Sequence, residues 1–324
     1  MDHTTVFHAS LAIFSLMILG CGLRHFRWLA PEADRTIMHL SVNLLYPCLI
    51  FSNILKTDLS GHFATLWIFP ACGFLIVLAS LIFCWVFTRL PVAVTGLYDS
   101  RQRRTFIACV SVFNYGFLPI PLVKQLYPET EALTLLFIFI LGVEFALWTL
   151  AVPQIAGGLE RGWWKKMFRA PLCAILLAVS ANFLGVGSHM PQAVSHSLEL
   201  LGNAQIPLSL IMIGAIIYDE LIQNVRTMRK RDTTKIILGT FLLRAVFLPA
   251  MMIWLATFFP NYRWLQTIIV IQAGMPCATM PIVFSRLYGG APNVAVWCSL
   301  SSNFLSLATV VFWISLGMRV IGAV

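Results

Sequence analysis

One long apolar segment of this chain is interrupted by Asn114-Tyr115-Gly116-Phe117-Leu118-Pro119-Ile120-Pro121, and another by Gln272-Ala273-Gly274-Met275-Pro276-Cys277-Ala278-Thr279-Met280-Pro281. Proline has no backbone N–H, and its ring clashes with a carbonyl one turn earlier, at a cost of about 3 kcal/mol inside a helix. Hydrocarbon offers no water to the freed carbonyls, so such breaks persist only where protein or a wet cavity receives them. Two matched breaks therefore predict a pair of broken membrane helices and a transporter binding site near the bilayer midplane.

The composition places the whole chain in a membrane. Hydrophobic residues make up 59% of the 324 positions, the mean hydropathy is +0.84, and charged residues make up 11%, against about 25% in soluble domains. Each apolar stretch is close to the roughly 20 residues that a bilayer core requires. We predict an all-α membrane protein with ten transmembrane helices, at about 5–23, 36–55, 63–88, 104–126, 131–155, 170–187, 194–218, 233–257, 264–287 and 293–318.

Basic residues alternate strictly between the loops that join these spans. The first, third, fifth and seventh loops contain three, four, four and five Lys or Arg residues, whereas the second, fourth, sixth and eighth contain one, one, none and one. This positive-inside pattern predicts that both termini lie on the outer side of the membrane. It accounts for the net charge of +9 without nucleic acid as a partner, and we expect a bacterial inner membrane.

The two halves of the chain show weak internal similarity. The segment 43–47 resembles 203–207, and Pro121-Leu-Val-Lys-Gln-Leu-Tyr127 resembles Pro281-Ile-Val-Phe-Ser-Arg-Leu-Tyr288. Repeats of five spans must have opposite membrane orientations because five is odd, and the charge alternation requires the same. We predict two inverted five-helix repeats, 1–156 and 170–324, joined by a cytoplasmic linker at 157–169.

The broken helices predict an anion site. The start of a half-helix exposes unpaired N–H groups and a partial positive charge of about half an electron, which suits a carboxylate. The amide of Asn114 can donate to that carboxylate, and Gln272 occupies the comparable place in the other break. Asn114 could equally cap the broken helix, and both roles can coexist. The predicted site comprises Asn114, Gly116, Pro119, Pro121, Gln272, Met275, Pro276, Cys277 and Pro281, with Ser52 contributed by a neighbouring helix.

Two charged residues, Glu144 and Arg244, lie in apolar surroundings within spans 5 and 8. A charge at mid-bilayer costs about 2.5–3.5 kcal/mol on insertion scales, so both side chains should face the protein interior. One interpretation makes Glu144 a group that binds and releases a coupling proton. The other, which we favour, is a structural ion pair between Glu144 and Arg244, with Arg244 also able to cap carbonyls freed near Pro249.

At these residues the chain resembles the auxin efflux carrier family, which includes plant carriers and many bacterial relatives. Both breaks are similar to family signatures, and they are the more specific part of the resemblance. Supporting similarity comes from Leu45-Tyr46-Pro47-Cys48-Leu49-Ile50-Phe51-Ser52 in span 2 and from Ile206-Pro207-Leu208-Ser209-Leu210 in span 7. Pro119 departs from the family, which more often has glycine there, and the extra proline should stiffen the break.

The resemblance implies ten helices in a crossover fold shared with bile-acid and sodium–proton carriers. It also implies a scaffold of spans 1, 2, 6 and 7, a mobile transport bundle built from the other spans, and a homodimer formed through the scaffold. The function implied is secondary-active or facilitative transport of a small organic carboxylate anion by alternating access, with substrate bound where spans 4 and 9 cross.

Other functions stay open at this level. A sodium-coupled symporter of bile-acid-like anions is one alternative, although spans 4 and 9 contain no acid between Phe106 and Tyr127 or between Leu265 and Tyr288. We therefore expect proton coupling or uncoupled movement. A non-transporting membrane sensor or a channel is another. The sequence has no nucleotide-binding loop, no His-rich ligand cluster and no Ser/His/Asp set within the spans, so we expect neither an enzyme, a metal nor a cofactor.

Overall fold

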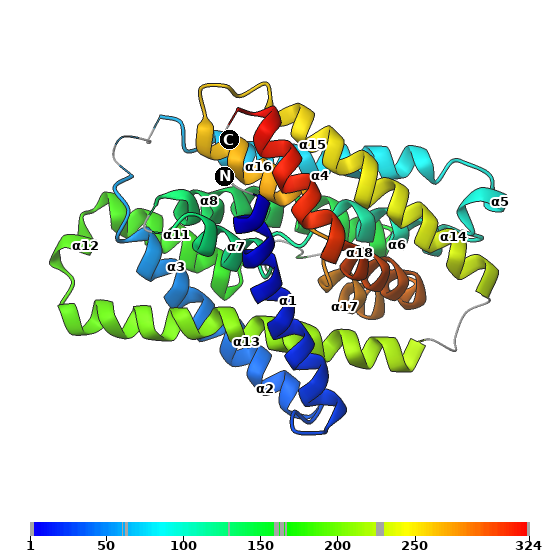
Figure 1. The fold of residues 1–324 in the computed structure, drawn as a ribbon, viewed down its shortest axis with the longest axis horizontal. Coiled ribbons are helices and arrows are strands. Elements are labelled where there is room, and N and C mark those ends of the chain that lie inside the picture. Colours follow the sequence, from blue (N-terminus) through cyan, green and yellow to red (C-terminus); the bar gives the residue numbers. More distant parts are fainter. Residues whose placement is uncertain are drawn as a thin grey trace.

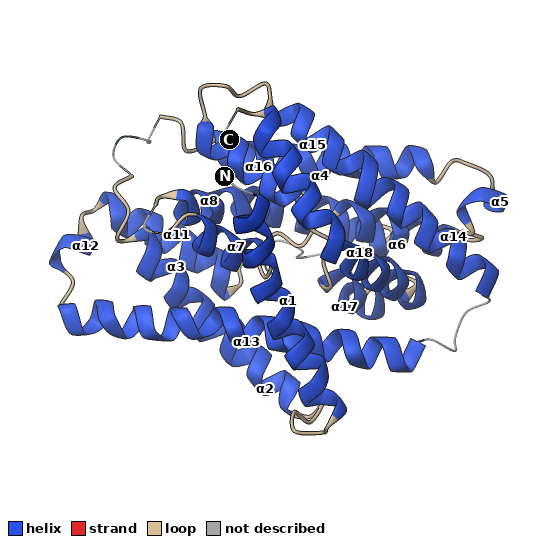
Figure 2. Cartoon of the chain, in the orientation of Figure 1, coloured by secondary structure: helices blue, strands red, loops and turns tan. Residues whose placement is uncertain are grey.

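The computed structural model describes residues 3–59, 61, 64–128, 130–158, 162, 165, 167–224 and 230–322, and within these residues it contains helices and loops but no strand (Figure 2). The all-helical prediction is confirmed. The predicted linker 157–169 lies largely outside the described residues. The α-helices are α1 His3–His25, α2 Ala33–Leu40, α3 Tyr46–Ile54, α4 Ile68–Phe87, α5 Val92–Thr95, α6 Ser100–Ser111, α7 Pro119–Leu126, α8 Ala132–Ala146, α9 Val152–Ala156, α11 Ala170–Phe183, α12 Val186–His189, α13 Gln192–Asn224, α14 Lys230–Thr240, α15 Leu248–Ala256, α16 Arg263–Ala273, α17 Met280–Leu287 and α18 Pro292–Val320.

Six stretches of the described chain are long and apolar enough to span a bilayer: Thr4–His25, Ala33–Ile54, Ile68–Phe87, Ala132–Ala156, Gln192–Ile222 and Asp232–Ala256. The other four predicted spans correspond to the short α11, to α18, whose two parts are bent by 64°, and to the pairs α6–α7 and α16–α17. The structure thus supports a polytopic helical membrane protein, while the ten-helix inverted arrangement stays a prediction.

Three of the spanning stretches contain a π-helical segment. These segments are η1 (Ser41–Leu45), η3 (Leu147–Ala151) and η4 (Phe241–Phe247), and each ends two residues before a proline: Pro47, Pro153 and Pro249. A proline removes one N–H and pushes on the preceding turn, and a wider π turn accommodates both effects without ending the helix. As a result, spans 2, 5 and 8 continue through their prolines, whereas spans 4 and 9 do not.

The long helix α13 runs along the long axis of the molecule, with α12 near one end of that axis and α5 near the other (Figure 1). α1 crosses and packs on α13, α3 packs on both α13 and α11, and α4 packs on α8. Glycines allow the closest approaches, because a Cβ at Gly214 would lie 1.9 Å from the carbonyl oxygen of Met17 and one at Gly20 would lie 2.0 Å from that of Ile211. This packing groups spans 1, 2, 6 and 7, but their role as a fixed scaffold stays a prediction.

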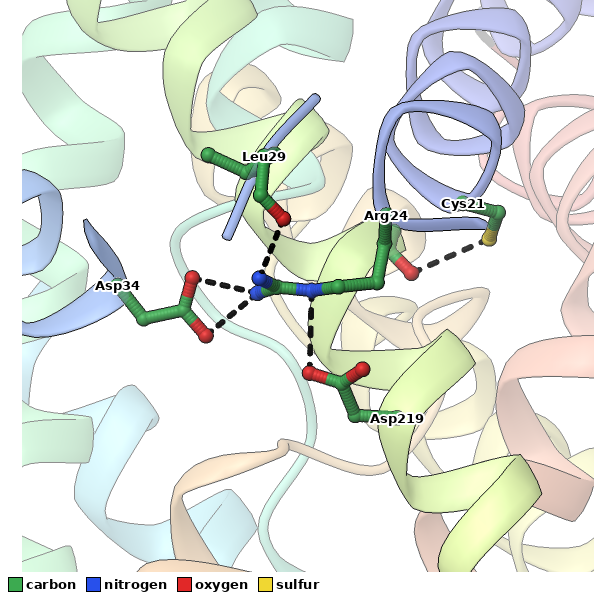
Figure 3. A network of polar contacts seen from close by, with 6 residues as sticks. Cys21, Arg24, Leu29, Asp34 and Asp219 are labelled. Carbon is green, nitrogen blue, oxygen red and sulfur yellow. Dashed lines mark hydrogen bonds and ion pairs between the residues drawn. The ribbon is translucent and has the colours of Figure 1, made fainter. Parts of the chain in front are cut away.

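The buried side chain of Arg24 links three helices at one end of spans 1, 2, 6 and 7 (Figure 3). Both carboxylate oxygens of Asp34 accept hydrogen bonds from Arg24 Nη2 at 2.5 Å, and the Leu29 carbonyl accepts one from Nη1 at 2.7 Å. Arg24 Nε lies 3.1 Å from Asp219 Oδ2. The ion pairs join α1, the start of α2 and α13 at the end of the molecule that carries the basic first loop.

Candidate functional site at the paired helix breaks

Both predicted helix interruptions are present in the structure. α6 ends at Ser111 and α7 begins at Pro119, while α16 ends at Ala273 and α17 begins at Met280. Pro119 and Pro281 lie in the first two positions of α7 and α17, where the missing N–H costs nothing because those donors have no partner inside the helix. The prolines therefore begin the second half-helices.

The two breaks pair with each other through their backbones. Asn114 N donates to Pro276 O at 2.8 Å, and Ala278 N donates to Val112 O at 2.9 Å. These bonds flank an antiparallel bridge between Phe113 and Cys277. Backbone N–H and C=O groups that have no partner within the half-helices therefore form hydrogen bonds with the other break. Such partners are required in hydrocarbon, where water is absent.

Side chains add to this pairing. Gln272 Nε2 donates to the Tyr115 carbonyl across the breaks at 3.1 Å, and Cys277 N donates to Ser302 Oγ of α18 at 3.1 Å. Gln272 and Cys277 are both fully buried. Their observed contacts hold the breaks together and do not place either side chain in a cavity.

Arg244 of η4 binds carbonyls of the second break. Its Nε and Nη2 donate to Met275 O at 2.8 and 2.6 Å, and Nη2 also reaches Gln272 O at 3.2 Å. The guanidinium lies over the ring of Phe113 in the first break, 5.3 Å from its centroid. The side chain of Arg244 is 3% exposed, so it is an internal part of the paired breaks.

The favoured ion pair between Glu144 and Arg244 is wrong. Glu144 Oε1 accepts from the Tyr115 hydroxyl at 2.8 Å, and Oε2 accepts from Trp148 Nε1 at 3.2 Å. Arg244 does cap freed carbonyls, but these belong to the second break and not to the region of Pro249. Each charged side chain thus binds other polar groups, and the sequence does not show which of these groups lie within hydrogen-bonding distance.

A cavity of about 150 Å³ lies beside the paired breaks. It has a few polar groups set among many apolar ones, as small-molecule sites commonly have. Its polar lining comes from Tyr46, Asn114, Tyr115, Glu144, Arg169 and Thr279. Its apolar lining includes Met38, Val42, Phe117, Leu147, Trp148, Met167, Leu172, Met280 and Phe284.

Asn114 is the predicted residue whose geometry matches both proposed roles. Its Oδ1 accepts a hydrogen bond from Leu118 N, at 3.4 Å, at the start of α7. Its Nδ2 is buried and has no hydrogen-bond partner, although an unsatisfied buried donor costs about 1–3 kcal/mol. The residue is 3% exposed and lines the cavity. Capping uses the oxygen and leaves the amide donor available.

The other predicted site residues divide by location. Gly116 lines the cavity with Asn114, whereas the second-break residues Gln272, Met275, Pro276 and Cys277 lie in the buried backbone pairing and do not line it. Pro119, Pro121 and Pro281 are buried in the first turns of the half-helices α7 and α17.

Ser52 is not brought to this site. It is buried in α3, donates to Leu49 O at 3.1 Å, and lines a separate cavity of about 480 Å³. That second cavity also contains Lys56, Lys124 and Glu199. Ser52 belongs to the half of span 2 beyond Tyr46, and one helix cannot present both ends of its length to the same pocket.

Several contributors to the cavity were missed from the sequence, and three of them are Arg169, Trp148 and Tyr115. Arg169, just before α11, was counted as a loop charge, yet its guanidinium lies 4.8 Å from the ring centroid of Trp148. Trp148 lies one helical turn after Glu144, a spacing that places both on one helix face and could have been noticed. Tyr115 adjoins Asn114 in the quoted stretch, but nothing in the sequence showed which way its hydroxyl points.

A family described as "Membrane transport protein" matches the chain over residues 5–161 and 158–314. The chain belongs to that family. The family includes the auxin efflux carriers, so the resemblance drawn from the two breaks is confirmed. Membership together with the apolar helices establishes an integral membrane protein of a transport family.

A relative in the archaeon Methanothermobacter thermautotrophicus (strain Delta H) is named "Uncharacterized transporter". It is 26% identical over 310 residues, which cover 94% of this chain and 95% of the relative. The match therefore extends through both breaks and both halves. Neither comparison says what is transported.

Proposed function

We propose that this membrane transport protein is a secondary-active or facilitative carrier of a small organic carboxylate anion, which binds beside the paired breaks and crosses by alternating access. The unpartnered Asn114 Nδ2 in the lining of the cavity is the observation that carries this proposal. A carboxylate would supply the acceptor that this buried donor lacks, and its apolar body would contact the surrounding Phe117, Trp148 and Phe284.

The surrounding dipoles and charges favour an anion. Thr279 and Met280 line the cavity at the start of α17, so the partial positive charge of that half-helix faces it. Arg169 adds a full positive charge at the lining. Glu144 opposes it, but both of its oxygens are engaged by Tyr115 and Trp148.

The cavity beside the breaks reaches toward the basic-loop end of the molecule. Met38 and Arg169 adjoin the first and fifth loops, whereas Lys56 and Pro128 of the other cavity adjoin the second and fourth. With the orientation that the loop charges predict, the first cavity faces the cytoplasm. We infer that the structure corresponds to an inward-facing state, with both termini outside.

Asn114→Asp tests the proposal sharply, because aspartate keeps the oxygen that caps α7 but replaces the amide donor by an acceptor and adds a negative charge. We expect wild-type protein in proteoliposomes to take up or release at least one radiolabelled monocarboxylate or dicarboxylate in a saturable way. We expect Asn114→Asp to weaken its binding by at least about tenfold, since a hydrogen bond to a charged group contributes about 1.5–3 kcal/mol. The matched control is Asn261→Asp, in the exposed loop between α15 and α16.

Unchanged binding in a folded Asn114→Asp protein would leave Asn114 with the capping role alone. Absence of saturable binding across a panel of aliphatic and aromatic acids, at two pH values, would argue against a carboxylate carrier. Flux that rises linearly without saturation would favour a channel.

A further inference from the structure

Arg244 is a buried cation that has no anionic partner among the residues that the structure describes. It is 3% exposed, its hydrogen bonds go to the carbonyls of Met275 and Gln272, and its Nη1 has no partner. Within the described part of the chain no carboxylate lies within ion-pair distance of it. A buried charge is normally paired, since desolvation costs several kcal/mol per ion, so the carbonyls must compensate for the missing anion.

The second break supplies that compensation. α16 ends at Ala273, where the aligned peptide dipoles leave a partial negative charge of about half an electron. Gln272 O accepts an N–H from Met275 within the break at 3.1 Å and still receives Arg244 Nη2. Met275 O receives two N–H groups of the same guanidinium. In transporters with broken helices, such unwound carbonyls and half-helix C-termini are the groups that coordinate a soluble coupling cation.

We propose that the guanidinium of Arg244 is a resident cation that occupies the place of a coupling cation at the second break, so that this site takes no sodium from solution. The role in coupling depends on the proposed transport function, but the occupancy of the site does not. Arg244 is a positioning residue here, because its described contacts are with Gln272, Met275 and Phe113, which do not line the cavity. It acts through the break that carries Thr279 and the start of α17.

The local structure of span 8 determines where the Arg244 side chain lies. It lies in the middle of η4, a π segment two residues from Pro249, and π turns redirect side chains relative to a regular helix. Its guanidinium also faces Phe113, which forms the bridge with Cys277. The cation therefore touches both breaks at their crossing and is held there by a continuous helix.

Thermal unfolding of the purified full-length protein in detergent provides the test. The probes are NaCl, KCl and guanidinium chloride at millimolar concentrations, with N-methyl-D-glucamine chloride keeping ionic strength constant. We expect the Tm of the wild type to be the same in all of them within about 1 °C. Arg244→Met should lower the Tm and open the carbonyl site, so that a small cation raises its Tm by about 3 °C or more.

The matched control is Arg89→Met, which removes the same charge from an exposed position over Trp85 and should gain no cation dependence. A rise in the wild-type Tm that is specific to sodium would overturn the proposal, and so would a folded Arg244→Met protein whose Tm ignores all three cations. If Arg244→Met does not fold, the wild-type titration and Arg244→Lys still decide, because the lysine variant should also ignore sodium. Failure of carboxylate binding in the Asn114 experiment would leave these results unaffected.

Discussion

At the scale of single residues, the two amide side chains of the breaks each use one polar atom in a hydrogen bond to the backbone and leave the other without a partner. Asn114 uses its oxygen for Leu118 N and keeps its amide donor, while Gln272 uses its amide for Tyr115 O and leaves Oε1 unpartnered. An amide has both donors and acceptors, so it can support the backbone and bind a ligand.

Glu144 lines the cavity together with Asn114, so we propose it as the candidate group for coupling transport to protons. Its carboxylate binds the hydroxyl of Tyr115, next to Asn114, and the indole of Trp148, on which Arg169 stacks. We expect Glu144→Gln to retain transport within several-fold but to change its dependence on pH, because the variant cannot exchange a proton. Uptake measured between pH 5 and 8 checks this, with Glu32→Gln at an exposed position as control. Identical pH profiles for wild type and Glu144→Gln would remove Glu144 as the coupling group.

At the scale of elements, five prolines of the apolar stretches have two outcomes that depend on their surroundings, while Pro207 lies inside the continuous α13. Pro47, Pro153 and Pro249 follow π segments inside continuous spans, whereas Pro119 and Pro281 begin new half-helices after a break. The difference lies in the residues before them, since each break also has a glycine and a partner break that pairs with its backbone. A single broken helix would offer no hydrogen-bond partners for the backbone N–H and C=O groups that its break leaves free.

Close helix contacts depend on glycine, and α4 against α8 provides the clearest test. A Cβ at Gly142 would lie 1.7 Å from Pro70 O, whereas one at Gly22 would meet nothing within 4 Å. We expect Gly142→Ala to destabilise the protein by about 1–3 kcal/mol through overpacking. Gly22→Ala should be neutral or stabilising by up to about 1 kcal/mol, because alanine is the better helix former. Thermal unfolding of both variants in detergent measures the contrast, and equal Tm values would contradict the packing of α4 on α8.

At the scale of the whole molecule, α13 contacts both half-helices that follow the breaks. Near one end, Asn203 accepts a hydrogen bond from Lys124 of α7, and Glu199 pairs with Lys56 at 2.8 Å. Near the other end, Glu220 pairs with Arg286 of α17 at 2.8 and 3.1 Å. If α7 and α17 move against α13 during the alternating access that we propose, the Lys124–Asn203 and Arg286–Glu220 contacts must break in each cycle.

Removing one of these contacts should therefore change the populations of the two states. We expect Arg286→Gln to favour the outward-facing state by about fivefold, which corresponds to about 1 kcal/mol, the upper range for exposed ion pairs. The upper value applies because Arg286 is half-exposed whereas Glu220 is buried. The measurement is the rate at which a membrane-impermeant thiol reagent labels the Ser52→Cys variant from outside, with and without Arg286→Gln. Protein without the Ser52→Cys change corrects for the native cysteines. An unchanged rate would mean that the Arg286–Glu220 pair does not bias the states.

Residues close together in the chain were sufficient to predict the membrane class, the apolar stretches and the two helix breaks. The alternation of loop charge can also be read from them directly. Apolar length, loop charge and a Gly–Pro interruption act locally, so consecutive residues are sufficient to show them. Of the site residues predicted from the breaks, Asn114 and Gly116 line the cavity.

Only the tertiary structure decided which polar groups meet. It separated Glu144 from Arg244, placed Gln272 across the breaks, moved Ser52 to another cavity and brought Arg169 into the lining. The reason is that a buried donor binds the acceptor within about 3 Å of it, and residues far apart in sequence reach that distance only through the packing and rotation of whole helices.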